Sequence, residues 1–260
     1  MEKLGKNPSI WNVSRLEQLF RRTGLFFWGL RGTATNDVIN GFADHWRGSA
    51  ARGSKIMAVG SVERPNINGF DDFEWLRDLR TFGGNQARSK ARSLIKIWLR
   101  QNERWALKSW QPDTMGKRLA SLIFCYDWYG RSADEGFQHQ ISATVRLQAR
   151  CLAIDWKRLR DCDARVEALS GLIIAEAALG SNSDDLNNLM EFLVQLVDSM
   201  LHEDGGHKSR MPNTHMQVLR NLIEIRNIGP SKKLAQLAWL DKTIARMGSI
   251  CRMWRHADGQ

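Results

Sequence analysis

The chain has 260 residues, of which 43% are hydrophobic, and a formal net charge of +10. This length is sufficient to bury a core in one large domain, or in one domain with an attached arm. No apolar run approaches the ~20 residues that span a bilayer, and none has the pattern of a secretory signal, so neither is expected. The four cysteines are scattered without CxxC spacing, and no histidine lies at zinc-ligand spacing, which predicts free thiols in a reducing compartment and no metal site. Because no secretory signal is expected, a cytoplasmic location is predicted.

The positive charge is concentrated near the C-terminus. Residues 1–204 contain 28 Lys and Arg against 25 Asp and Glu, a net charge of +3, whereas residues 205–260 contain 10 against 3, a net charge of +7. Such an excess favours a polyanionic partner near the C-terminal part, although a basic surface that serves only solubility is the alternative.

Residues 1–70 are predicted to form a basic amphipathic arm followed by an irregular linker. Residues 32–70 are rich in Gly, Ser and Asn, with one short extended piece expected over residues 55–62. In residues 1–31 an apolar stripe lies beside arginines, and we expect the stripe to dock on the protein's own body in preference to a membrane. The stripe consists of Leu16, Leu19, Phe20 and Trp28, and the arginines are Arg15, Arg21, Arg22 and Arg31.

Residues 71–260 are predicted to form one all-α domain. Apolar residues recur at helical spacing throughout, and no strand pair or hairpin turn is evident. The helix over residues 166–179 is apolar nearly all round, so we expect it to be buried on several sides. The other expected helices begin at residues 71–72, 87, 113, 134, 185, 216 and 231, the last with Ser231 as its N-cap.

Residues 204–215 (DGGHKSRMPNTH) separate two of these helices. Paired glycines break the first helix, and Pro212 suits the opening of the next. A connector between core helices does not need the two histidines, the lysine and the arginine found here. The segment is therefore interpreted as the wall of a site, with a solvated loop as the alternative.

Several stretches resemble the heparinase II/III-like polysaccharide lyases, especially an uncharacterised bacterial branch. They are residues 72–84 (DFEWLRDLRTFGG), 91–98, 167–180, 204–212 and 253–259, in the order found in the family. The resemblance implies an (α/α) toroid of antiparallel helix pairs, here incomplete or truncated because the family's C-terminal β-sandwich is absent. It also implies β-elimination on acidic, uronic-acid-containing polysaccharides, with no cofactor.

The resemblance implies the roles of the candidate site residues. Such chemistry needs a positioned base and a group that neutralises the substrate carboxylate. The family's Asn-His pair falls on Asp163 and Ala164, and its Tyr-His pair falls on Thr214 and His215, so the usual set of groups is incomplete. The candidates are His215 and His207 as catalytic residues, and Lys208, Arg210, Arg77, Arg80, Trp75 and Asp163 as substrate-binding residues.

The predicted function is therefore that of a polysaccharide lyase module acting on an acidic polysaccharide. If the activity requires a C-terminal β-sandwich module as partner, this chain alone is expected to be inactive. The alternative is a non-catalytic module that binds a polyanion, either an acidic glycan or nucleic acid. Nucleic acid is the weaker candidate, because no known nucleic-acid-binding signature is present. A third possibility is a purely structural fragment.

Overall fold

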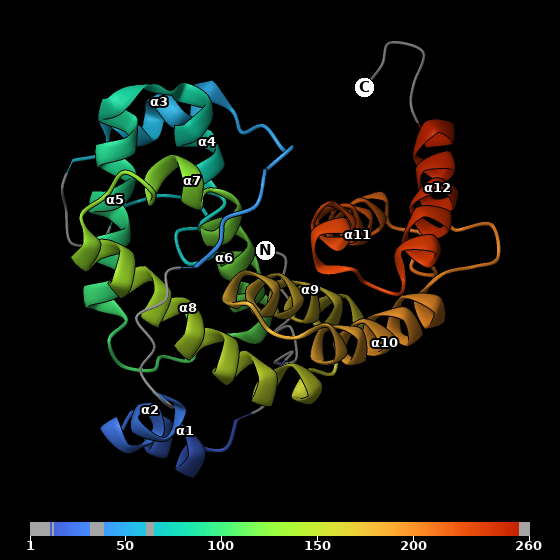
Figure 1. Ribbon diagram of the computed structural model, residues 1–260, viewed down its shortest axis with the longest axis horizontal. Helices are drawn as coiled ribbons and strands as arrows, with labels where there is room; N and C mark the ends of the chain where they lie inside the picture. Colours follow the sequence, from blue (N-terminus) through green and yellow to red (C-terminus); the bar gives the residue numbers. More distant parts are fainter. Residues whose placement is uncertain (1–10, 12, 32–38, 61–64, 255–260) are drawn as a thin grey trace, which may run out of the picture.

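The computed structural model of the protein describes residues 11, 13–31, 39–60 and 65–254 (Figure 1). In these residues the regular elements are helices, and no named strand occurs. The all-α prediction is thus confirmed, whereas closure into a toroid stays a prediction. In chain order the elements are α1 (Arg15–Arg21), α2 (Gly24–Arg31), α3 (Ala50–Ala58), α4 (Trp75–Phe82), α5 (Gly84–Gln101), α6 (Pro112–Phe124), α7 (Tyr126–Tyr129), α8 (Glu135–Asp155), η1 (Trp156–Arg158), α9 (Cys162–Leu179), α10 (Ser183–Met200), α11 (Pro212–Lys232) and α12 (Leu237–Trp254).

Helix α9 is the centre of the packing, as its apolar sequence predicts. It contacts α6, α8, α10 and α11, and most of its side chains are buried. Its closest neighbour is α6, which it meets through Gly116 and Gly171. A Cβ on Gly171 would lie 2.3 Å from the Cα of Gly116, so both positions require glycine for the two backbones to approach.

Several helix boundaries follow from capping residues that the sequence reveals. The Asp134 carboxylate accepts a hydrogen bond from the backbone N–H of Phe137 at the start of α8. Gly180 ends α9 in the left-handed conformation, with φ of 83°. The predicted N-cap at Ser231 is wrong, because α11 continues to Lys232 and the Ser231 hydroxyl donates to the carbonyl of Ile228.

The segment over residues 39–58 lies on the helical body. Helix α3 replaces the extended piece predicted over residues 55–62, of which residues 61–62 lie outside the described residues. The Asp78 carboxylate on α4 accepts hydrogen bonds from the backbone N–H of Ser49 and from the Arg52 guanidinium. Ile39 is buried. The domain division at residue 70 stays a prediction.

Helices α1 and α2 form a hairpin that is held against α8. The Arg21 guanidinium donates two hydrogen bonds of 2.6 Å to the Asp155 carboxylate, and both side chains are buried. Glu17 joins this cluster through Arg21 and Arg158, and the hydrogen bond from Arg158 is the main cause that lowers the pKa of Glu17 to about 2. Phe27 packs on Trp110, with their ring centroids 5.1 Å apart.

Two further predictions from the sequence can be compared with the described residues. No helix among them combines the length and hydrophobicity needed to cross a bilayer. All four cysteines are free thiols, as their spacing predicts.

Candidate functional site

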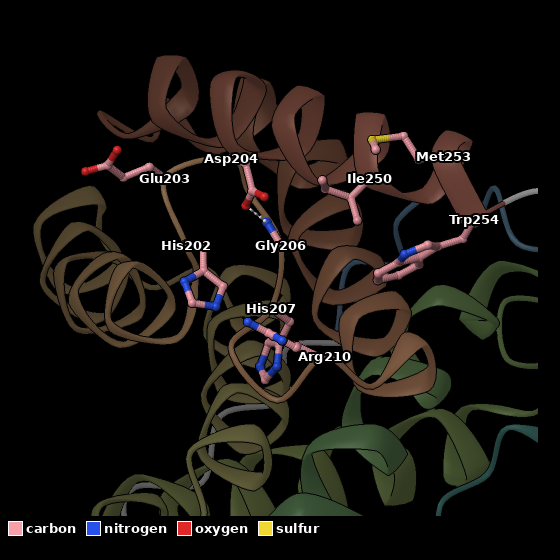
Figure 2. Close-up of a pocket in the computed structure, with 9 residues that line it drawn as sticks. All are labelled: His202, Glu203, Asp204, Gly206, His207, Arg210, Ile250, Met253 and Trp254. Atoms are coloured by element: carbon pink, nitrogen blue, oxygen red, sulfur yellow. Dashed lines mark hydrogen bonds between the residues drawn. The ribbon is translucent and has the colours of Figure 1, made fainter.

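A pocket of about 990 Å³ opens between the 201–211 loop and the C-terminal end of α12 (Figure 2). Figure 2 shows Ile250 and Trp254 reaching from α12 toward the loop, with His207 and Arg210 on the opposite side. The segment that the sequence singles out as a site wall therefore does line a pocket. The residues around it are His202, Glu203, Asp204, Gly206, His207, Arg210, Ile250, Met253 and Trp254.

The loop has a defined backbone conformation. Leu201 and His207 form an isolated antiparallel bridge, in which the N–H of Lys208 donates to the carbonyl of Met200 at 2.8 Å. Gly205 makes the turn with φ of 91°, and a Cβ there would lie 2.7 Å from the Cβ of Arg246 on α12. Glycine is therefore needed both for the left-handed backbone and for the close approach of α12.

His207 connects this loop to the start of α9. Its Nδ1 accepts a hydrogen bond from the backbone N–H of Ser209, which places the ring proton on Nε2. Nε2 lies 3.1 Å from Oδ1 of Asp163, but the angles of this contact are not those of a hydrogen bond. The contact is therefore electrostatic. Burial raises the pKa of the Asp163 carboxyl, although His207 opposes this. The structure thus brings together two candidates that are distant in sequence.

His215 lies apart from the pocket lining, in the core. Its Nε2 is 3.0 Å from the carbonyl oxygen of Met247, and its ring packs edge-on against Trp254 with centroids 4.8 Å apart. Burial lowers its pKa, which favours the neutral ring. The environment is that of a histidine packed in the core. Among the described residues, no group forms a hydrogen bond with its Nδ1.

Arg77, the centre of the other candidate group, is buried in ion pairs. Its guanidinium lies 2.8 Å from both the Asp44 and the Glu224 carboxylates. Arg80 also pairs with Asp44 and donates to the carbonyl of Trp46. These acids offset the positive charge that an anionic substrate would need. The cluster joins three parts of the chain, with Arg77 and Arg80 on α4, Glu224 on α11 and Asp44 in the segment before α3.

The remaining candidates have mixed positions. Trp75 is a core residue whose indole N–H donates to the carbonyl of Phe70 at 3.3 Å. Lys208 and Arg210 are exposed, and the Lys208 ammonium donates to the carbonyl of Ser199. The described residues contain no cluster of three or more His, Cys, Asp or Glu that could hold a metal ion.

A second surface feature lies on the α1–α2 hairpin, which occupies the lower edge of Figure 1, away from α12. The apolar stripe expected to dock on the body faces solvent instead, while the opposite side of the hairpin, with Arg21, is buried. We call this surface the hairpin stripe. It consists of Leu16 (81% exposed), Leu19 (61%), Phe20 (52%), Leu25 (67%) and Trp28 (74%).

Comparison with known proteins finds a bacterial relative. The chain is similar to FtsZ-localized protein C of Caulobacter vibrioides (strain NA1000 / CB15N), with 27% identity over 190 residues. The alignment covers 72% of this chain but only 32% of the length of that protein. No family model and no solved structure matches the sequence.

This relative overturns the predicted function. The prediction of a polysaccharide lyase module is wrong, because the similarity is to a protein named for its localisation with FtsZ. The acidic polysaccharide partner has no support either. The site explains the error in physical terms, because Arg77 and Arg80 are already paired with acids and Trp75 belongs to the core. The roles of the individual candidate residues stay predictions.

Proposed function

We propose that this chain is part of a bacterial cell-division protein that associates with FtsZ and attaches to a lipid surface through the hairpin stripe. The name of the relative supports the association with FtsZ. The observation that carries the lipid attachment is the stripe itself, in which five large apolar side chains are at least half exposed within thirteen residues. For the helical body we retain the (α/α) arrangement of helix pairs as a proposal, together with a cytoplasmic location.

The shape and charge of the hairpin suit the interface of an anionic membrane. A helix with a large apolar face and basic flanks lies in the plane of the interface, with Trp and Phe at the level of the headgroups. Residues 13–31 contain four Arg and one Glu, and of these arginines Arg21 is buried against Asp155 while Arg15 and Arg22 are exposed. The single acid, Glu17, points to Arg21 and Arg158 in ion pairs. Little negative charge therefore remains to oppose contact with acidic lipids.

Three contacts hold the α1–α2 hairpin in a fixed orientation on the helical body. The buried pair of Arg21 and Asp155 and the packing of Phe27 on Trp110 hold one side of it on the body. The hydrogen bond from Arg150 to the carbonyl of Leu30 adds a third contact. Because the hairpin is ordered before it binds, insertion of the stripe does not have to offset the entropy of forming two helices.

Replacing Leu19 and Trp28 together with glutamate should strongly weaken vesicle binding. Each apolar side chain contributes about 1.5–2 kcal/mol when it leaves water, so the double variant Leu19→Glu/Trp28→Glu should bind roughly 100- to 1,000-fold more weakly. The measurement is flotation of the full chain with vesicles that contain phosphatidylglycerol. Both side chains are exposed, so thermal unfolding should be unchanged.

Two controls make this experiment specific. Phe82 on α4 is exposed as well, but it lies outside the hairpin, so Phe82→Glu should bind vesicles like the wild type. Arg15→Gln/Arg22→Gln should weaken binding to phosphatidylglycerol vesicles and leave binding to phosphatidylcholine vesicles unaltered. Equal flotation of the wild type and Leu19→Glu/Trp28→Glu would contradict the proposed attachment.

A further inference from the structure

Two short segments of the helical body lie beside the α1–α2 hairpin and carry the same mixture of apolar and basic side chains as its exposed face. The first is the loop between α5 and α6, in which Leu107 is 38% exposed and Arg104 and Lys108 are exposed. The second is the end of α8 with η1, in which Ile154 is 52% exposed and Lys157 is exposed. We call these five residues the rim.

The first rim segment is held beside the hairpin by two buried tryptophans. The ring of Trp105 lies 5.7 Å from the guanidinium of Arg21, and the ring of Trp110 lies 5.1 Å from that of Phe27. Consecutive Cα atoms are about 3.8 Å apart, so the backbone of Leu107 lies within about 8 Å of the backbone of Trp105. The exposed residues between the two tryptophans therefore emerge at the edge of the hairpin.

The second rim segment is held there by the ion pairs of the hairpin. Asp155, which follows Ile154 in the chain, accepts both hydrogen bonds from Arg21. Arg158, which follows Lys157, donates to a carboxylate on α1 at 2.7 Å. Figure 1 shows the hairpin below α8, in agreement with these contacts. The exposed side chains of this segment thus also lie at the edge of the hairpin.

The rim has an excess of positive charge with few partners. Among the described residues, Arg104 and Lys108 have no ion pair or hydrogen bond, and the Lys157 ammonium faces two aromatic rings. Residues 100–108 contain three cations and one acid, and residues 154–160 also contain three cations and one acid. The acid of the second stretch is buried in its pair with the hairpin. The rim is therefore complementary to an anionic surface.

We propose that the rim binds the phosphates of anionic phospholipids while the hairpin stripe enters the same lipid surface. Arg104, Lys108 and Lys157 pair with headgroup oxygens, and Leu107 and Ile154 pack at the level of the headgroups. These apolar members favour a lipid surface over nucleic acid, because only the lipid removes them from water. This inference rests on the proposed function and adds to it the residues that select the lipid.

The test is flotation of the full chain with two kinds of vesicle, phosphatidylglycerol mixed with phosphatidylcholine, and phosphatidylcholine alone. Each cation near an anionic membrane strengthens binding about 5-fold, so Arg104→Gln/Lys108→Gln/Lys157→Gln should bind the mixed vesicles roughly 100-fold more weakly. The same variant should bind phosphatidylcholine vesicles like the wild type. High salt should remove most of the difference. All three side chains are exposed, so thermal unfolding should be unchanged.

A matched control removes the same charge at the end of the molecule away from the hairpin. Lys208→Gln/Lys242→Gln/Arg252→Gln changes three exposed cations in the loop before α11 and on α12, and it should bind both kinds of vesicle like the wild type. An equal loss of binding in this control would show that total charge, and not the rim, sets the preference for anionic lipid.

The outcomes separate this inference from the proposed function. If the wild type floats with neither kind of vesicle, the proposed lipid attachment fails and the rim assignment fails with it. If the wild type floats, Leu19→Glu/Trp28→Glu does not, and Arg104→Gln/Lys108→Gln/Lys157→Gln floats with the mixed vesicles like the wild type, the rim assignment is overturned. Attachment through the hairpin stripe stands in that case.

Discussion

Replacing Arg77 with methionine should lower the free energy of unfolding at pH 7 by about 3–5 kcal/mol, the usual cost of removing one member of a buried ion pair. Arg77 lies 2.8 Å from both Asp44 and Glu224, and all three side chains are almost fully buried. The variant leaves two carboxylates without their main partner. Arg80 and Arg220 retain contacts with these acids at 3.0 and 3.4 Å, so the loss should fall within this range and not exceed it.

The pH dependence of the Arg77→Met variant provides a check on this cause. Burial raises the pKa of the Glu224 carboxyl and Arg77 opposes this, so removing Arg77 should raise that pKa further. The difference in stability from wild type should therefore shrink as the pH falls toward 5. Adding Glu224→Gln to the variant should recover part of the loss at pH 7. The control is Arg100→Met, an exposed arginine on α5, which should change stability by less than about 0.5 kcal/mol. An equally small effect of Arg77→Met would show that the cluster contributes little.

The second large effect should come from Glu167, a carboxyl buried on α9. Burial raises its pKa from 4.5 to about 7, despite hydrogen bonds from Gln217 at 2.6 Å and Asn221 at 3.2 Å. Below pH 4.5 the group is protonated in both the folded and the unfolded state and has no effect. As the pH rises from 4.5 to 7, the unfolded chain loses this proton first, so stability falls, by about 3 kcal/mol in full.

Glu167→Gln should remove this pH dependence. The amide keeps an oxygen that accepts from Gln217 and Asn221 but never becomes charged, so the variant should exceed the wild type in stability by about 3 kcal/mol more at pH 8 than at pH 4.5. Denaturant unfolding at the two pH values measures this difference. Glu191→Gln, at an exposed position on α10, should show no comparable change. A constant difference between Glu167→Gln and wild type across this range would contradict the assigned burial.

Local signals in the sequence were sufficient to predict most of the helices. Asp134 and Gly180 are capping residues, and the apolar composition of residues 166–179 predicts the buried helix α9. The prediction failed at Ser231 because proline in the last turn of α11 removes only one hydrogen bond, so the helix continues past it. The left-handed Lys233, with φ of 53°, ends the helix instead.

The direction in which the hairpin faces could not be predicted from its own sequence. Both of its sides carry large apolar residues, and the deciding contact is the pair of Arg21 with Asp155, which is 134 residues away. The pocket posed the same problem. The glycines and histidines of residues 204–215 indicated one wall, but nothing local indicated that Ile250 and Trp254 form the other.

The lyase prediction failed for a different reason. It rested on the order of several weak motifs, whereas the residues that perform the chemistry were already missing at Asp163, Ala164 and Thr214. In the structure Asp163 lies 3.1 Å from His207, a contact that joins α9 to the loop. Similarity of helical segments indicates an arrangement of helices, but a function requires the reactive groups themselves.

The most direct test of the proposed function is flotation of FtsZ with phosphatidylglycerol vesicles in the presence and absence of this chain. We predict that FtsZ floats with the vesicles only when the wild-type chain is added, and that Leu19→Glu/Trp28→Glu leaves FtsZ at the bottom of the gradient. If the wild-type chain floats while FtsZ does not, or if the hairpin variant still carries FtsZ to the vesicles, the proposal that this chain links FtsZ to a lipid surface is contradicted.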